Sequence, residues 1–191
     1  MAALFGADKL VDCSPMITGD TFGFMNVPYV GTDVTTVAND GYLKTIFNLG
    51  CDVGSHIDSP YHFFDPARSV GEIELEQLVA RGAVFDLTDK TNATPYGNYG
   101  LSVQDILEWE EKYGQIPDGA IVVMKTGWNQ YFDDRQLYTG LGADPNEPNL
   151  FQFPGFLPEA AEWLLDNRNI KGLGVDSASL DVGTSTDYLV H

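Results

Sequence analysis

The chain has 191 residues, of which 43% are hydrophobic and 12% aromatic, as in folded domains and unlike disordered tails. We expect residues 1–191 to form a single domain, because this length can bury a substantial core. With 10 basic against 28 acidic residues, the chain carries a net charge of −18 and has no basic stripe. Nucleic acid and anionic membranes are therefore poor partners.

The cysteines and the N-terminus bear on the location of the protein. Cys13 and Cys51 form neither a disulfide framework nor a Cys-x-x-Cys motif, which favours a reducing compartment. Met1–Phe5 is too short for the apolar region of a signal peptide, and no run approaches the roughly 18 apolar residues of a membrane span. We therefore predict a cytoplasmic protein.

The first third of the chain is predicted to alternate between short strands and loop. Lys9–Cys13 is predicted as a strand, and Thr18–Asp33, rich in Gly, Pro and aromatic residues, as an irregular loop. Tyr42–Leu49 alternates as a strand that runs directly into the stretch Asn48–Phe64. That stretch contains two of the three histidines, and we expect the rest of the chain to serve as its scaffold.

Polar side chains alternate along this histidine-rich stretch. If it is a strand, Asp52, His56 and Asp58 lie on one face. Two strand residues span about 6.6 Å, which lets His56 and Asp58 bind one cation. Pro60 cannot donate to a ladder, so we predict that the strand ends there and that His62 approaches from a turn. The pattern predicts a divalent metal site with an acid/base beside it.

The metal chemistry follows from the ligand types. Zn²⁺ and Mn²⁺ both accept imidazole and carboxylate, so His56 and Asp58 do not choose between them. Such an ion lowers the pKa of bound water from about 15.7 to about 7, and His62 is then the candidate general acid or base. Asp52 is a ligand only if a bulge shortens the roughly 20 Å that six strand residues span. The alternative interpretation is a polar turn packed by the two phenylalanines after His62.

Aromatic side chains are candidates for the wall of a substrate pocket. These candidates are Phe22, Phe24, Phe63 and Trp128. Phe22 and Phe24 lie in the Gly- and Pro-rich loop, where exposed rings can wall a ligand. Packing at the edge of the core explains the loop phenylalanines and Trp128 equally well.

Helices and strands alternate after the histidine-rich stretch. Ile73–Ala80 is predicted as a short helix and Ala83–Leu87 as a buried strand. Ser102 and Asp105 form the pattern of a capping box, which opens a helix that ends at Gly114.

The last third continues this alternation. Ile121–Lys125 is apolar on both faces and is predicted as a central strand, and Tyr138–Pro154 as a long polar loop. Pro158 begins a helix, and the strand Gly172–Val175 delivers Asp176 at its end. The alternation predicts an α/β fold with a mixed sheet, in which ligand groups gather at the strand ends.

The stretch Gly54–Phe63 reads Gly-Ser-His-Ile-Asp-Ser-Pro-Tyr-His-Phe. It resembles the His-x-Gly-Thr-His-x-Asp-x-Pro-x-His-Phe signature of the cyclase family, which includes bacterial kynurenine formamidase and isatin hydrolase. Further segments that resemble this family are Val84–Thr88, Gly119–Trp128 and Gly174–Ser179. The resemblance covers most of the chain, and its first motif is specific.

The resemblance implies a metal-dependent amidohydrolase with a small barrel-like β core flanked by helices, usually a homodimer or homotetramer. By position it makes His56 and Asp58 metal ligands and His62 the catalytic acid/base. His191, which by position alone is a frayed chain end, matches a later histidine that binds a second ion in two-zinc members.

The chain departs from the family pattern in two places. Asp52 stands where the first metal histidine usually sits, and a hard carboxylate there favours Mn²⁺. The chain also stops at His191, where relatives continue through a segment with a glutamate ligand. We therefore expect a site that holds one ion, or a shortened form of the domain with an incomplete site.

Together these observations predict a hydrolase of a small cyclic amide or an N-formyl aromatic amide that uses a divalent metal, Mn or Zn. The competing hypothesis is a non-catalytic, oligomeric member that binds a metal or a small ligand without hydrolysis.

Overall fold

The computed structural model describes residues 11–19, 21, 23 and 30–191, and the chain divides into two compact units, residues 1–57 and 58–191. The predicted strand Lys9–Cys13 falls partly outside the described residues, and its described part, residues 11–13, forms no strand. None of the described helices is both long and apolar enough to cross a lipid bilayer.

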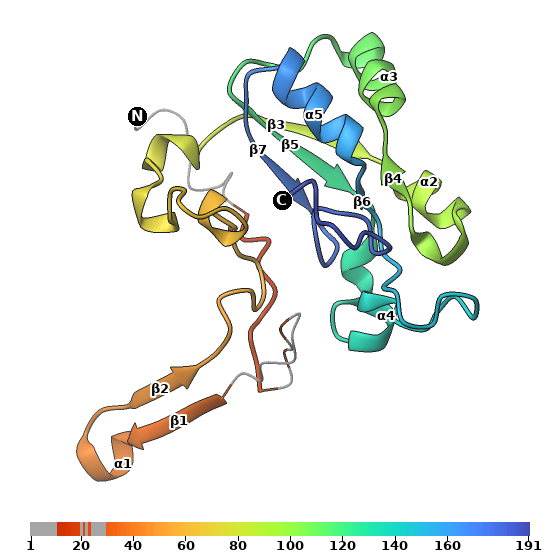
Figure 1. Ribbon diagram of the computed structural model, residues 1–191. Coiled ribbons are helices and arrows are strands. Elements are labelled where there is room, and N and C mark those ends of the chain that lie inside the picture. Colours follow the sequence, from red (N-terminus) through yellow and green to blue (C-terminus); the bar gives the residue numbers. More distant parts are fainter. Residues whose placement is uncertain (1–10, 20, 22, 24–29) are drawn as a thin grey trace. The chain divides into compact units, whose positions relative to one another are not determined.

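The first unit contains an antiparallel hairpin, drawn in orange in Figure 1. Its elements are β1 (Val30–Thr35), α1 (Val37–Asp40) and β2 (Lys44–Asn48). Thr36 caps α1 by accepting a hydrogen bond from the Asn39 N–H at 3.3 Å. β2 confirms the strand predicted over residues 42–49. β1 instead begins within the predicted loop, because its β-branched residues suit pairing with β2.

The histidine-rich stretch is not a strand, so the predicted alternation of its faces is wrong. After β2 the chain runs through turns and bends at residues 51–55, and Gly54 has a φ of 72°, which no strand allows. Pro60 begins the 3₁₀ turn η2 (Pro60–His62), because its fixed φ and missing N–H suit a first helical position. The prediction that His62 approaches from a turn is confirmed.

A parallel sheet forms the centre of the second unit. In spatial order its strands are β3 (Gly82–Asp86), β5 (Ala120–Lys125) and β7 (Ile170–Val175). β5 is the central strand, as its apolar sequence predicts, and it buries Val122 and Met124 completely.

β4 (Gly100–Leu101) and β6 (Gly155–Phe156) form a second, two-stranded parallel sheet in this unit, and an isolated β-bridge joins Phe156 to Asp181. The α/β class is therefore confirmed, but a single mixed sheet is not observed: among the described residues, antiparallel pairing occurs in the hairpin of the first unit and parallel pairing in the sheets of the second. Within the described residues the sheets are open, so the barrel-like core is not observed. The long crossover connections of the second unit let successive strands run parallel, whereas the short connection between β1 and β2 reverses the chain.

Two amphipathic helices, α3 (Val103–Tyr113) and α5 (Pro158–Asn167), lie side by side over this sheet in Figure 1. They bury Ile106 and Leu164 in a core that also contains Phe85 of β3. Both helices begin where the sequence predicts, α3 at a capping box and α5 with a proline in its first turn.

Short elements complete the second unit. The helices are α2 (Thr88–Ala93) and α4 (Arg135–Thr139), and the 3₁₀ turns are η3 (Val70–Glu72), η4 (Leu75–Gln77), η5 (Pro95–Gly97) and η6 (Trp128–Tyr131). The helix predicted over residues 73–80 is therefore wrong. Ile73 lies extended, with ψ 122°, and separates η3 from η4.

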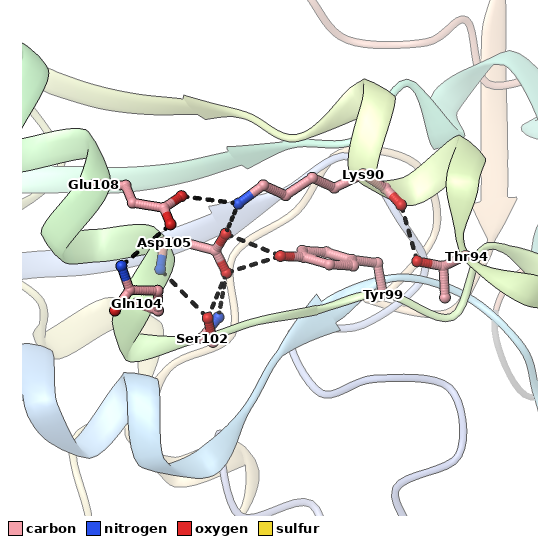
Figure 2. Close-up of polar contacts among 7 residues, drawn as sticks. All are labelled: Lys90, Thr94, Tyr99, Ser102, Gln104, Asp105 and Glu108. Atoms are coloured by element: carbon pink, nitrogen blue, oxygen red, sulfur yellow. Dashed lines mark hydrogen bonds and ion pairs between the residues drawn. The ribbon is translucent and has the colours of Figure 1, made fainter.

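A buried carboxylate ties α2 to α3. Asp105, 4% exposed, accepts from the Ser102 N–H at 2.8 Å, while Ser102 Oγ accepts from the Asp105 N–H at 3.3 Å. Tyr99 Oη and Lys90 Nζ donate to the same carboxylate at 2.9 and 2.5 Å (Figure 2). Lys90 also donates to Glu108 at 3.1 Å, but that carboxylate is exposed.

These contacts set the charge states of Asp105 and Tyr99. Burial alone would raise the pKa of Asp105, but the hydrogen bonds from Lys90, Ser102 and Tyr99 outweigh it and lower the pKa below its usual 3.8. Burial and the bond to Asp105 raise the pKa of Tyr99 to about 12. At neutral pH the carboxylate is therefore ionised and the tyrosine is a neutral donor.

We expect Asp105→Ala to lower the free energy of unfolding by about 3 kcal/mol, because Lys90, Tyr99 and Ser102 lose their shared acceptor. Equilibrium urea unfolding followed by circular dichroism measures this change. Glu108→Ala is the matched control, since it removes an exposed carboxylate from the same lysine and should lower the unfolding free energy far less. Equal losses in the two variants would contradict the role of Asp105.

The stabilisation from Asp105 should also depend on pH. Because its pKa is lower in the folded than in the unfolded chain, the stabilisation is present above the unfolded value of 3.8 and is lost as the pH falls through the folded value. The difference in unfolding free energy between wild type and Asp105→Asn should therefore be constant from about pH 7 to 5 and shrink below about pH 4. A difference that grows on acidification would be inconsistent with this assignment.

Candidate functional site

The second unit brings two imidazoles to one carboxylate. Asp58 Oδ1 lies 3.9 Å from the Nε2 of His62, four residues later, and Asp58 Oδ2 lies 3.8 Å from the Nε2 of His191. Both distances exceed hydrogen-bond length, so the rings face the carboxylate without bonding to it directly. Together with Asp181, described next, these residues form what we call the Asp58 cluster.

His191 is held in place, contrary to the frayed end that its position suggests. Its side chain is 9% exposed, and its Nδ1 lies 2.5 Å from Oδ2 of Asp181. Asp181 is buried, and its Oδ1 accepts from the Val190 N–H at 3.0 Å. Burial alone would raise the pKa of Asp181, but the bonds from His191 and Val190 outweigh it and lower the pKa from its usual 3.8.

An aromatic ring lies beside both imidazoles. The Phe63 ring centroid is 4.8 Å from that of His62 and 4.8 Å from that of His191. Tyr188 extends this apolar surface, with its centroid 5.6 Å from that of Phe63. The structure therefore brings Phe63 to the cluster, and its predicted contact with substrate stays a prediction.

The loop after β7 is fixed by contacts to β5 and β6. Asp176, at the end of β7, accepts from the N–H groups of Thr126 and Gly127 at 2.8 Å each, which ties β7 to the end of β5. Phe156 of β6 then donates its N–H to the Leu180 carbonyl at 2.7 Å. Asp176 holds the backbone at these strand ends together, and the loop beyond it carries Asp181 and His191 of the cluster; the gathering of ligand groups at the strand ends stays a prediction.

Two of the predicted ligands belong to the first unit. His56 Nδ1 lies 3.0 Å from the Gly54 carbonyl oxygen, and Asp52 is partly buried. Asp58, by contrast, belongs to the second unit. Binding of one ion by His56 or Asp52 together with Asp58 therefore stays a prediction.

The other aromatic candidates lie elsewhere. Phe22 and Phe24 are outside the described residues. Trp128 is buried at 8% exposure, and its Nε1 donates to the Tyr138 carbonyl at 2.7 Å. It lines a cavity of about 540 Å³ beside α2 and α4, and no residue of the Asp58 cluster is among the lining residues. The structure does not bring Trp128 to the imidazoles, and its role as a substrate wall stays a prediction.

The donor atoms of the Asp58 cluster suit a divalent ion, because Zn²⁺ and Mn²⁺ both take imidazole and carboxylate. His191 has the arrangement of many ligand histidines: a carboxylate holds one ring nitrogen, and the other faces a second donor. In the described part of the chain, no group of three or more His, Cys, Asp or Glu side chains is placed to hold an ion. The cluster is therefore a candidate centre that needs at least one further ligand.

Comparison with known proteins decides the family. The sequence pattern described as "Putative cyclase" matches residues 11–182. The chain belongs to the cyclase family. Isatin hydrolase of Roseibium aggregatum is 31% identical over 139 residues, which are 71% of this chain and 50% of that protein. Cyclase-like protein 1 of Oryza sativa subsp. japonica is 28% identical over 195 residues, covering 97% of this chain and 62% of that protein.

Solved structures of the cyclase family share this fold. Isatin hydrolase A from Ralstonia solanacearum matches with a TM-score of 0.82 at 26% identity, over 93% of this chain and 70% of that one. An isatin hydrolase bound to the product analogue thioisatinate matches with a TM-score of 0.81 at 25% identity, with the same coverage. The chain spans about half the length of the curated relatives it matches.

Sequence reasoning missed Asp181, whose carboxylate holds His191. Ten residues span about 33 Å along a strand and about 15 Å along a helix, so no local pattern pairs these two positions. The only signal is an acidic residue that follows the Gly174–Ser179 segment, in a loop with no predicted element.

Proposed function

We propose that this cyclase-family protein is a metal-dependent hydrolase of small amides, with a cyclic amide or an N-formyl aromatic amide as its substrate. The observation that carries the proposal is the Asp58 carboxylate, which faces the Nε2 atoms of both His62 and His191. The similarity to isatin hydrolases supports hydrolysis as the reaction. The proposed ion is Mn²⁺ or Zn²⁺, and Asp52, as a hard carboxylate ligand, would favour Mn²⁺.

Exposure separates the proposed roles of the two imidazoles. The His62 side chain is 46% exposed, which suits a group that exchanges protons with a bound substrate. The His191 side chain is 9% exposed and held by a carboxylate, which suits a ligand. We therefore assign His62 as the acid/base and Asp58 and His191 as ligands, with His56 and Asp52 completing the proposed set.

An ion bound there would act as a Lewis acid that polarises the amide carbonyl and acidifies water. Neutral His62 accepts at Nε2 the proton that the attacking water gives up, and the resulting imidazolium donates a proton to the departing nitrogen. Asp58, 3.9 Å away, stabilises that imidazolium. The reaction consumes one water, breaks the C–N bond and yields a carboxylic acid and an amine, which remain in one ring-opened molecule when the amide is cyclic.

Charge and aromatic surface support the proposed substrate class. The net charge of −18 disfavours anionic substrates, whereas a neutral amide is not repelled. The Phe63 ring beside both imidazoles offers an edge or face for an aromatic substrate. Phe22, Phe24 and Trp128 are proposed as further walls.

We expect His62→Ala to keep ion binding and to lower kcat by about 10²- to 10⁴-fold, because only the proton transfer is removed. Calorimetric titration with Mn²⁺ and Zn²⁺ measures binding, and a panel of N-formyl and cyclic amides measures turnover. Asp58→Ala should lose both properties. Tyr61→Ala, which removes an exposed ring next to His62, is the control and should keep both.

Unchanged turnover in the His62→Ala variant would remove the acid/base role. Stoichiometric ion binding by the wild-type protein without turnover on the whole panel would favour the non-catalytic metal-binding member.

We also propose that the protein is a homodimer or homotetramer. Apolar side chains of the hairpin in the first unit support this, since Val30, Val34, Leu43 and Ile46 are each between 47% and 59% exposed. An isolated two-stranded hairpin is marginal in water, and exposed apolar strands tend to pair with other chains.

Ile46→Asp should therefore shift the protein toward monomer, because it places a charge on that apolar surface. Size-exclusion chromatography with light scattering measures the mass. Asn39→Asp adds the same charge in the exposed helical turn α1 of the same hairpin, away from these side chains, and should leave the oligomer intact. A wild-type protein that is monomeric at micromolar concentration would contradict the proposal.

A further inference from the structure

We propose that Asp181 is a positioning residue: its buried carboxylate fixes the His191 ring in the tautomer that carries its proton on Nδ1 and directs an unprotonated Nε2 at Asp58. The proposal rests on the proposed function only in that this Nε2 would bind the ion. The tautomer itself is a property of the protein without any ion.

The carboxylate has a fixed location because the backbone that carries it is packed against β6. Asp181 pairs with Phe156 in an isolated β-bridge and is 1% exposed. A Cβ built on Gly155 would lie 2.5 Å from the Asp181 carbonyl group, so only glycine permits this approach. The side chain therefore starts from backbone that has little room to shift.

Both oxygens of Asp181 have assigned donors. Oδ1 accepts from the Val190 N–H at 3.0 Å, and Oδ2 lies 2.5 Å from Nδ1 of His191. An ionised carboxylate can only accept hydrogen bonds, so Nδ1 must carry the proton. In the neutral imidazole, Nε2 is then left with a free lone pair, and this is the atom that faces Asp58 at 3.8 Å.

The turn before His191 returns the chain to Asp181. Tyr188 has a φ of 51°, in the left-handed region that non-glycine residues rarely adopt, and its N–H donates to Ser185 Oγ at 3.3 Å. This reversal lets two successive residues, Val190 and His191, reach the same carboxylate. The Phe63 ring packs beside the imidazole and limits its rotation.

A merely structural role for Asp181 would also explain the bond to Val190. The test must therefore measure which nitrogen of the His191 ring carries the proton. Long-range ¹H–¹⁵N correlation spectra at about pH 8, recorded on the ion-free wild-type protein, should show His191 protonated on Nδ1. In Asp181→Asn the amide oxygen can keep the Val190 N–H, and the amide NH₂ then donates to Nδ1. The proton of the ring should therefore move to Nε2.

The wrong tautomer should also weaken ion binding, because a protonated Nε2 has no lone pair to donate. We expect the dissociation constant for Zn²⁺, measured by calorimetry, to rise by about 10- to 100-fold in Asp181→Asn. Asp187→Asn is the matched control, since Asp187 lies in the same turn and contacts Ser185. It should change neither the tautomer nor the affinity.

The proposal is overturned if wild-type His191 carries its proton on Nε2, a measurement that needs no variant to fold. It is also overturned if Asp181→Asn folds and keeps both the Nδ1 proton and the wild-type affinity for Zn²⁺. A tautomer that changes as expected in a protein without amide turnover would leave the positioning role standing and refute the hydrolase. Amide turnover by a protein whose His191 carries its proton on Nε2 would support the hydrolase and refute the positioning role of Asp181.

Discussion

A carboxylate buried to 1% exposure needs donors on both oxygens, because an unpaired charge in the interior costs several kcal/mol. Asp181 meets this requirement with groups that lie nine and ten residues further along the chain, the Val190 N–H and the His191 ring. The two hydrogen bonds to this carboxylate therefore both close the turn and orient the His191 imidazole. The position of His191 relative to Asp58 and His62 follows from that constraint.

Two other carboxylates work in a similar way at other points of the second unit. Asp105 collects Lys90, Tyr99 and Ser102 and joins α2 to α3 (Figure 2), and Asp176 joins the ends of β5 and β7 through backbone N–H groups. The Asp105 carboxylate accepts from an ammonium, hydroxyl groups and a backbone N–H, and the Asp176 carboxylate accepts from backbone N–H groups and a hydroxyl. Of these three carboxylates, only that of Asp181 bonds to an imidazole. The acidic composition of this cyclase-family chain thus contributes to its interior as well as to its surface charge.

Much of the second unit could be read from local sequence. The capping box at Ser102 and the proline at residue 158 mark helix starts that the structure contains, and the apolar run after Ala120 marks the central strand. These signals act within a few residues, so no tertiary information is needed. The histidine-rich stretch shows the opposite case. Its alternation suggested a strand, but a glycine in the left-handed region and a proline-led 3₁₀ turn replace it.

The sequence by itself determined the family, the α/β class, the turn that carries His62 and the identity of the groups that can bind an ion, because these depend on residue types and short spacings. Only the tertiary structure decided that His191 is held rather than frayed, that Asp181 is its partner and that Trp128 lines a separate cavity. It also decided that the sheets formed by the described residues are open. Such contacts join residues whose separation matches no local period, and they form because buried polar groups must be paired wherever the fold brings them together.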